Sequence, residues 1–154
     1  DGNLTETLLN KINFDPIFKN ADLRIAPASP GKASRLRRCL NGNVGTVYVN
    51  LEEANLILNE NHKNSKLAAQ ALTNIGVRRA IVTNGKKPVT VSEKNSLISL
   101  TPPIVNITRV TGAGDVFMAS HIQAEMVGKK NESAIRSALN QTAKYISSSE
   151  MLWH

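Results

Sequence analysis

Several residue types are scarce in this chain of 154 residues, and each scarcity excludes a class of protein. Cys39 is the single cysteine, so disulfides cannot stabilise the fold. No apolar run approaches the ~20 residues that a membrane-spanning helix needs, and no basic start followed by an apolar stretch indicates a secretion signal. We therefore expect a cytoplasmic protein without a membrane partner. The 41% of hydrophobic residues suffice for one core, which excludes a disordered chain.

Acidic residues are absent between Leu23 and Leu51, although the whole chain has 12 of them against 19 basic residues. The basic residues in this interval are Arg24, Lys32, Arg35, Arg37 and Arg38. Such a stretch is typical of a solvated helix face, of a site for a phosphate-bearing small molecule, or of a nucleic-acid surface. Aromatic residues form only 4% of the chain and do not alternate with the basic ones. This argues against nucleic acid as the partner.

Strand and helix patterns alternate along the chain. Runs rich in β-branched residues predict strands at about residues 23–26, 46–49, 79–83, 89–91, 97–100 and 104–107. Helical spacing of apolar residues predicts helices at about 4–12, 32–40, 51–58, 65–75 and 132–147, with a long one opened by residues 111–115 and reaching about 127. Helices separate the first three strands, which predicts an α/β fold with parallel strands, and the next two strands are typical of an antiparallel meander.

The strongest motif is Gly112-Ala113-Gly114-Asp115, directly before the long predicted helix. Glycines at this place leave backbone N–H groups able to face an anion, and the helix dipole adds positive potential. The same field favours the ionised form of a carboxylate at Asp115. A base beside an anion cradle is what phosphoryl transfer to a hydroxyl needs. The alternative is a glycine turn whose Asp115 merely favours the start of the helix.

Two further motifs follow predicted strands, at the sheet edge where open α/β sheets bind ligands. Asn50 ends one strand and Glu53 begins the next helix, and this amide and carboxylate would suit Mg²⁺ held partly through water. Alternatively, the pair simply favours a helix N-terminus. Thr83 and Gly85 follow the next strand, where a hydroxyl and an open backbone could touch a nucleotide. A hairpin turn is the alternative for that segment.

Taken in order, these motifs resemble the PfkB-type carbohydrate kinase family, which includes ribokinase. Residues 110–117 (VTGAGDVF) are close to the most specific signature of that family. Residues 1–4 (DGNL) and 27–33 (PASPGKA) are similar to the pseudouridine-kinase branch. The resemblance implies a ribokinase-like three-layer sandwich and an enzyme that uses ATP and Mg²⁺ to phosphorylate a sugar or nucleoside hydroxyl, pseudouridine among the candidates.

The resemblance also implies roles for individual residues. Asp115 would be the catalytic base, and Gly112, Ala113 and Gly114 would form the anion hole for the γ-phosphate. The remaining implied roles belong to Asn50 and Glu53, which would serve Mg²⁺ and phosphates, and to Thr83 and Gly85, which would lie along the nucleotide.

The chain departs from the family pattern at several positions. Pro88 stands where the family has a second glycine after Gly85, and Ala26 where members often carry Asp. Arg109 replaces the acid or Asn that helps to hold a monovalent cation, which argues against that cation here. These departures keep an alternative open: a non-catalytic nucleotide- or partner-binding fragment of a diverged kinase.

The resemblance covers nearly all of residues 1–154 but matches only the carboxyl-terminal half of the family. We therefore expect this chain to carry the ATP and phosphate-transfer site of a single kinase domain. The amino-terminal half, with its lid and most sugar contacts, would be the missing partner of the same protein. A homodimer is left open.

Overall fold

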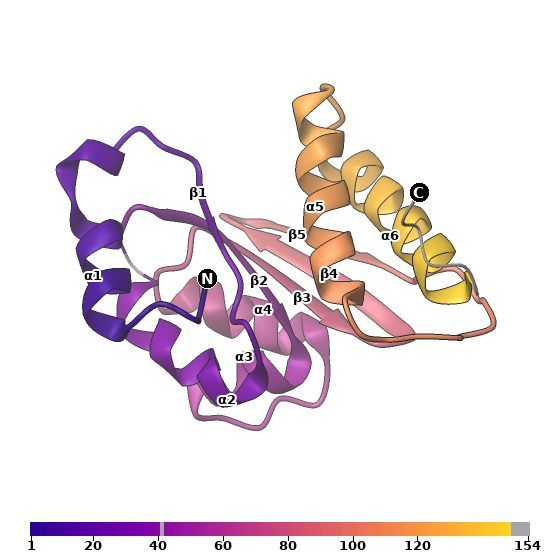
Figure 1. Cartoon of the computed structure of the whole chain (residues 1–154), viewed down its shortest axis with the longest axis horizontal. Helices are drawn as coiled ribbons and strands as arrows, with labels where there is room; N and C mark the ends of the chain where they lie inside the picture. Colours follow the sequence, from indigo (N-terminus) through magenta and orange to yellow (C-terminus); the bar gives the residue numbers. More distant parts are fainter. Residues whose placement is uncertain (41, 149–154) are drawn as a thin grey trace. The chain divides into compact units, whose positions relative to one another are not determined.

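The computed structural model describes residues 1–40 and 42–148, and the chain forms two compact units, Asp1–Ser99 and Leu100–His154 (Figure 1). A five-stranded sheet dominates the first unit, in the order β1-β2-β3-β4-β5. Its strands are β1 (Leu23–Ile25), β2 (Val44–Asn50), β3 (Arg79–Asn84), β4 (Lys87–Glu93) and β5 (Ser96–Leu100). β1, β2 and β3 pair in parallel, whereas β4 pairs antiparallel with β3. The predicted α/β class is confirmed.

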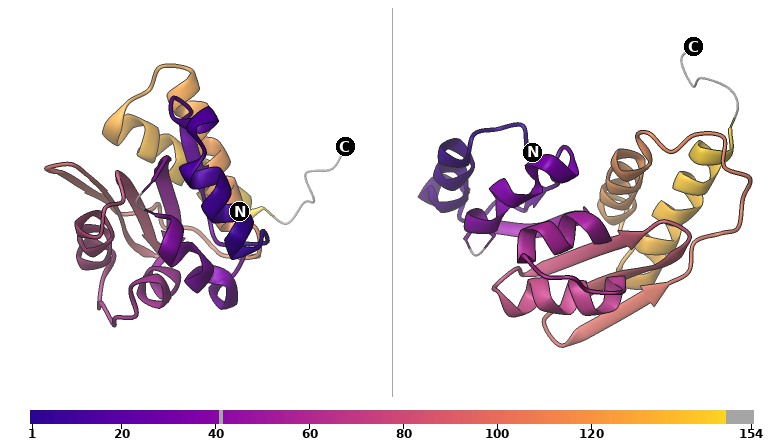
Figure 2. Two further views of the ribbon diagram at one scale, coloured as in Figure 1. Left: turned by 90° about the vertical axis from the view of Figure 1, so that its left-hand side faces the viewer. Right: turned by 90° about the horizontal axis from the view of Figure 1, so that it is seen from below.

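Helices α3 (Leu51–Leu58) and α4 (Ser65–Asn74) lie along one face of these strands (Figure 2). β2 is buried over its first six residues, as expected for a central parallel strand of valines and other apolar residues. α3 packs on β2, and α4 packs on β3 and β4. The core between them is apolar, with fully buried Val47, Ile57, Leu72 and Val82 at its centre. α1 (Glu6–Phe14) adds Leu9 to the same core.

The helix predicted at 32–40 takes a different form. It is a single α-turn, α2 (Pro30–Ala33), that continues as the 3₁₀ helix η2 (Ser34–Cys39). Ala33, Leu36 and Cys39 are all buried and three residues apart. A 3₁₀ helix has three residues per turn, so residues three apart lie directly above one another, whereas in an α-helix they drift around the axis. A second 3₁₀ turn, η1 (Pro16–Phe18), was not predicted, and its Ile17 N–H donates to the Asp15 side chain at 3.0 Å.

The strand predicted at 104–107 is wrong, because residues 101–112 contain neither strand nor helix. Ile104 and Ile107 are exposed, so the β-branched residues in this segment have no sheet to pack against. Pro102 and Pro103 precede them and lack the backbone N–H groups that a strand ladder needs. Residue composition alone indicated a strand here, and the prolines decide against it.

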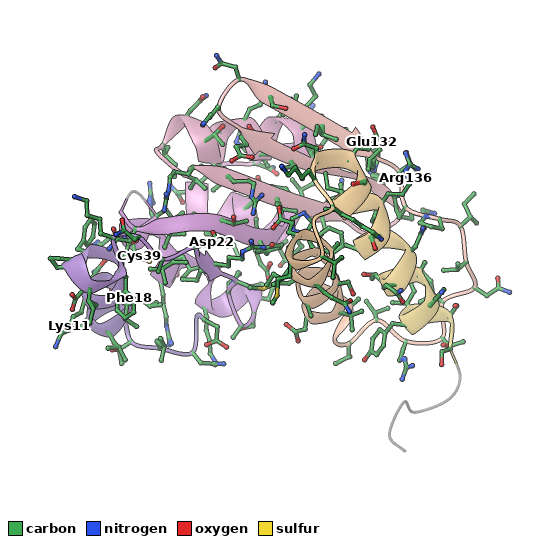
Figure 3. The ribbon with its side chains drawn as sticks, turned by 90° about the horizontal axis from the view of Figure 1, so that it is seen from above. Lys11, Phe18, Asp22, Cys39, Glu132 and Arg136 are labelled. Carbon is green, nitrogen blue, oxygen red and sulfur yellow. The ribbon has the colours of Figure 1, made fainter. Side chains whose placement is uncertain are left out.

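The second unit is a pair of helices, α5 (Ala113–Met126) and α6 (Asn131–Ser147), which pack against each other. Gly128, with a φ of +85°, lies in the short turn between them. Much of the buried surface of α6 is alanine, which lets two helices approach closely. Glu132 and Arg136 lie one turn apart on its exposed side and form an ion pair (Figure 3). No helix within the described part of the chain is long and apolar enough to cross a membrane.

Leu72 and Leu67 lie on the same helix, α4, but their exposed fractions are 0% and 48%. Replacing Leu72 with Ala leaves a cavity, so we expect the free energy of unfolding to fall by about 2–5 kcal/mol. The matched control Leu67→Ala makes the same chemical change at an exposed position and should cost less than about 1 kcal/mol. Urea denaturation followed by circular dichroism measures both, and equal losses would contradict this placement of the core.

Candidate active site

Two of the predicted site residues lie side by side at the carboxyl edge of the first unit. Asn50 and Thr83 are register partners on the parallel strands β2 and β3. Thr83 is also tied to the neighbouring strand, because its hydroxyl donates to the Val49 carbonyl at 3.5 Å. Parallel strands end at the same edge of a sheet, so the two polar side chains begin one common surface.

Asn50 and Glu53 form a reciprocal capping box at the start of α3. The Glu53 N–H donates to the Asn50 side-chain oxygen at 2.9 Å, and the Asn50 N–H donates to Glu53 Oε2 at 2.8 Å. The predicted helix-terminus role of this pair is therefore confirmed. The same bonds fix the Glu53 carboxylate, which is only 9% exposed, at the end of β2.

These two residues also fit the chemistry of Mg²⁺. Glu53 supplies a carboxylate and Asn50 a side-chain amide oxygen, and both are oxygen ligands of the kind that Mg²⁺ takes. Mg²⁺ is usually held by one or two carboxylates, waters and substrate phosphates rather than by a protein cage. Consistent with that, residues 1–40 and 42–148 contain no group of three or more His, Cys, Asp or Glu that could hold a metal alone.

Gly85 lies in the turn that joins β3 to β4, with a φ of +55°. Asn84 pairs with Lys87 across a two-residue loop, so the hairpin predicted as an alternative for this segment is confirmed. No atom lies within 4 Å of the position that a Cβ at Gly85 would take, so its backbone is open. Pro88 is the second residue of β4, and its carbonyl accepts a hydrogen bond from the Ser65 hydroxyl at 2.6 Å.

In the second unit, Gly112 is the N-cap residue of α5 and has a left-handed backbone, with φ +83° and ψ −5°. A Cβ at this position would lie 2.8 Å from the hydroxyl oxygen of Tyr145. Glycine is therefore required twice over, by the backbone angle and by the approach of the tyrosine. The helix starts at this position because Gly112 turns the chain sharply into it.

Gly114 differs from Gly112, because neither its backbone angle nor the space around it requires a glycine. Its φ lies outside the left-handed region, and no atom lies within 4 Å of its Cβ position. An alanine there would favour the helix by about 0.5–1 kcal/mol. The missing side chain instead leaves an open space at the helix N-terminus, beside the exposed carboxylate of Asp115.

Among the described residues, one amide of the predicted set of Gly112, Ala113 and Gly114 is already bonded inside the turn. The Ala113 N–H donates to the Val110 carbonyl at 3.1 Å, which engages it in a turn. Within the described residues, the N–H groups of Gly114 and Asp115 have no acceptor, as is usual for the first turn of a helix. The Asp115 amide is thus a donor that the sequence motif did not single out.

Arg109 does not fit a bound monovalent cation at its position. Its guanidinium carbon lies 4.1 Å from the centre of the Tyr145 ring, and its Nε donates to the Tyr145 carbonyl at 2.8 Å. A fixed positive charge repels a second cation. Tyr145 follows Arg109 by 36 residues and carries no sequence signal of its own, so only the fold reveals the pair.

The basic stretch at 24–38 is partly used inside the first unit. Arg24 forms an ion pair with Asp22 at 2.5 Å, and Arg35 donates to the Gly2 carbonyl at 3.2 Å. Exposed ion pairs of this kind contribute little to stability, but they reduce the positive charge available to a partner. Arg37 and Arg38 are exposed on η2.

Comparison with protein families gives a match to the pfkB family carbohydrate kinases over residues 5–150. The chain belongs to this family. A search of curated proteins gives no match. The family assignment agrees with the order of the three motifs along the chain. It leaves the acceptor substrate open.

Several solved structures are similar to this chain, and kinases named for carbohydrates and for adenosine are among them. A carbohydrate kinase from Agrobacterium tumefaciens has a TM-score of 0.81 and 25% identity, and the match covers 97% of this chain and 47% of that one. The apo adenosine kinase of Trypanosoma brucei brucei has a TM-score of 0.73 and 17% identity, with 84% and 44% covered.

A third structure is a putative ribokinase II from E. coli in complex with ATP and Mg²⁺, with a TM-score of 0.70 and 19% identity, covering 84% of this chain and 43% of that one. The ribokinase-like fold is therefore confirmed, as part of the whole fold. The chain spans less than half the length of each of these three structures.

The two glycines should respond oppositely to alanine. We expect Gly112→Ala to lower the free energy of unfolding by at least about 1–2 kcal/mol, because an alanine in the left-handed region is strained and meets Tyr145. Gly114→Ala should leave stability unchanged or raise it by up to about 1 kcal/mol. Urea denaturation of both variants provides the measurement, and the reverse order would show that the start of α5 is wrongly placed.

Proposed function

We propose that this chain carries the phosphoryl-transfer part of an ATP-dependent kinase that acts on a sugar or nucleoside hydroxyl. The observation that carries the proposal is the start of α5. There, the local backbone does not require a glycine at 114, and its missing side chain leaves an open space beside the exposed Asp115 carboxylate. The N–H groups of Gly114 and Asp115, at the same helix start, have no acceptor in the described part of the chain. Membership of the carbohydrate kinase family supports this proposal.

In the proposed reaction, Asp115 accepts the proton of the substrate hydroxyl, whose oxygen attacks the γ-phosphorus of ATP. The bond from that phosphorus to the bridging oxygen breaks, and ADP leaves with its electron pair. The amides of Gly114 and Asp115, with the dipole of α5, stabilise the charge on the transferred oxygens. Gly114 gives the phosphoryl group room to approach these amides.

The polar edge of the first unit has the complementary role of binding the nucleotide. Asn50 and Glu53 would hold Mg²⁺ through water, and bound Mg²⁺ would offset the negative charge of the phosphates. The Thr83 hydroxyl and the open backbone at Gly85 would contact the nucleotide. The proposed steps use no monovalent cation, because the fixed positive charge of Arg109 disfavours one at that position.

A nucleoside such as pseudouridine is the acceptor that we would test first. The two segments that resemble the pseudouridine-kinase branch, 1–4 and 27–33, contact each other in the first unit. Lys32 Nζ donates to the Asn3 side-chain oxygen, and the Asn3 N–H donates to Asp1 at 2.9 Å. Two branch-like stretches that lie far apart in the sequence thus form one local structure, which supports a shared function for them.

Asp115→Asn should abolish most turnover while sparing ATP binding. Loss of a general base typically lowers the rate by about 100- to 10,000-fold. We expect that loss in kcat for the full gene product, with the Kd for Mg-ATP changed less than about twofold. The matched control Glu132→Gln neutralises an acid in the first turn of α6 and should retain normal turnover. Normal turnover of Asp115→Asn would reject Asp115 as the base.

The chain of residues 1–154 should bind Mg-ATP yet fail to phosphorylate sugars or nucleosides by itself. We propose that it is the carboxyl-terminal half of the kinase, since the match covers less than half of each similar structure. A phosphotransfer assay compares the chain with the full gene product over a panel that includes pseudouridine, adenosine and ribose. ATP binding without transfer by both proteins would favour the alternative, a non-catalytic nucleotide-binding fragment.

A further inference from the structure

Within the described residues, the segment that leads into α5 forms hydrogen bonds at its end next to that helix. Residues 101–107 have exposed apolar side chains, with Ile104 fully exposed and Ile107 59% exposed, and they form neither strand nor helix. The last residues before Gly112 behave differently, because they bond to the C-terminal turn of α6. The start of the proposed active site therefore depends on contacts with another helix of the same unit.

Backbone and side-chain groups of Thr108 make the first of these contacts. Its N–H donates to the Ile146 carbonyl at 2.8 Å, and its hydroxyl lies 3.0 Å from the Ser148 carbonyl oxygen. The Arg109 N–H shares the Ile146 carbonyl at 3.2 Å. Carbonyls in the last turn of a helix have no partner within the helix, so they are natural acceptors for a neighbouring segment.

Arg109 adds a charged contact at the same helix end. Its guanidinium lies on the face of the Tyr145 ring and donates to the Tyr145 carbonyl. A positive charge is favourable at a helix C-terminus, where the dipole is negative, and a planar guanidinium can stack and donate at once. Arg109 thereby restrains the Tyr145 ring.

Tyr145 in turn reaches the residue before the cradle. Its hydroxyl donates to the Thr111 carbonyl at 3.0 Å and lies 2.8 Å from the place where a Cβ on Gly112 would be. The carbonyl of Thr111 belongs to the peptide that ends at the Gly112 nitrogen, so this bond fixes the orientation of that peptide. Gly112 then sets the direction of the Gly114 and Asp115 amides.

We propose that Tyr145, restrained by Arg109, is a positioning residue for phosphoryl transfer. It holds the Thr111–Gly112 peptide so that the amides and the carboxylate at the start of α5 keep their geometry. This inference rests on the proposed function. Catalytic groups must be held to within about 0.5 Å, and a displacement of about 1 Å can lower a rate by about 100-fold. A single hydroxyl can therefore affect the rate far more than the stability.

The first test is Tyr145→Phe in the full gene product, since it removes only the hydroxyl and keeps the ring beneath Arg109. We expect kcat to fall by about 10- to 100-fold, with the KM for Mg-ATP changed less than about twofold. The matched control Thr142→Val removes another hydroxyl of α6, which donates to the Ala138 carbonyl at 2.9 Å. That control should retain the normal kcat and KM.

A second variant, Arg109→Lys, tests the support of the ring. Lysine keeps the positive charge but loses the planar stacking and the Nε donor to the Tyr145 carbonyl. We expect a smaller fall in kcat than for Tyr145→Phe, again with an unchanged KM for Mg-ATP. A normal kcat for Tyr145→Phe would overturn the inference, and a normal kcat for Arg109→Lys alone would contradict the restraint that it assigns to Arg109.

The third test needs no activity and examines the contact itself. Gly112→Ala is compared in the native background and in the Tyr145→Phe background by urea denaturation. Removing the hydroxyl leaves the ring carbon at 3.5 Å as the nearest atom to the new Cβ. The denaturation midpoint should therefore fall less in the Tyr145→Phe background, because only the backbone strain remains. Equal falls would overturn the inference, since the hydroxyl would not then lie over Gly112.

These measurements distinguish a failure of the inference from a failure of the proposed function. An active native enzyme whose Tyr145→Phe variant keeps its kcat overturns the inference and leaves the kinase proposal intact. A native full-length protein that phosphorylates nothing on the panel overturns the proposed function, and the catalytic role of Tyr145 with it. A selective loss of kcat together with unequal falls in the midpoint supports the inference.

Discussion

The left-handed backbone at Gly112 is the constraint on which the second unit depends. It lets the chain turn directly from residues 108–111 into α5, and it brings the first-turn amides and Asp115 to the exposed end of the helix. Tyr145 occupies the space that any other residue at 112 would need for its side chain. The close approach of Tyr145 to Gly112 thus helps to set three features: the left-handed backbone angle, the start of α5 and the exposure of the Asp115 carboxylate.

In the first unit, the parallel pairing of β2 and β3 has the corresponding role. The register that opposes Asn50 and Thr83 follows from strands whose buried positions must face the core. Since both strands end at one edge, the polar residues that follow them lie close together there, and no further structural element is needed to position them. The ligand-binding role that we propose for this edge is therefore a result of the strand pairing. Asn50 also begins α3, through the capping box that it forms with Glu53.

Local patterns in the sequence predicted most of the fold, because they report on nearest neighbours along the chain. The valines of β2, the glycines at 112 and 114 and the turn at Gly85 each indicated their element correctly. Two predictions failed where a different local constraint prevailed. A buried face of period three produced the 3₁₀ helix η2, and the prolines at 102 and 103 prevented a strand.

The motifs also named candidate residues at the start of α5, yet they could not indicate that Ala113 turns its amide to Val110 or that Tyr145 reaches Thr111. The second of these contacts depends on how the chain returns to itself after 34 residues.

Glu53 has one further consequence, which is thermodynamic. Its carboxylate closes the capping box, so the stability of the first turn of α3 depends on where that carboxylate lies. Any ligand that draws the carboxylate toward itself must change the capping bond, and by linkage the capping bond changes the affinity for that ligand by the same factor. If the proposed Mg²⁺ and nucleotide bind at this edge, their binding and the formation of the first turn of α3 are coupled equilibria, and the start of α3 would report on what is bound beside it.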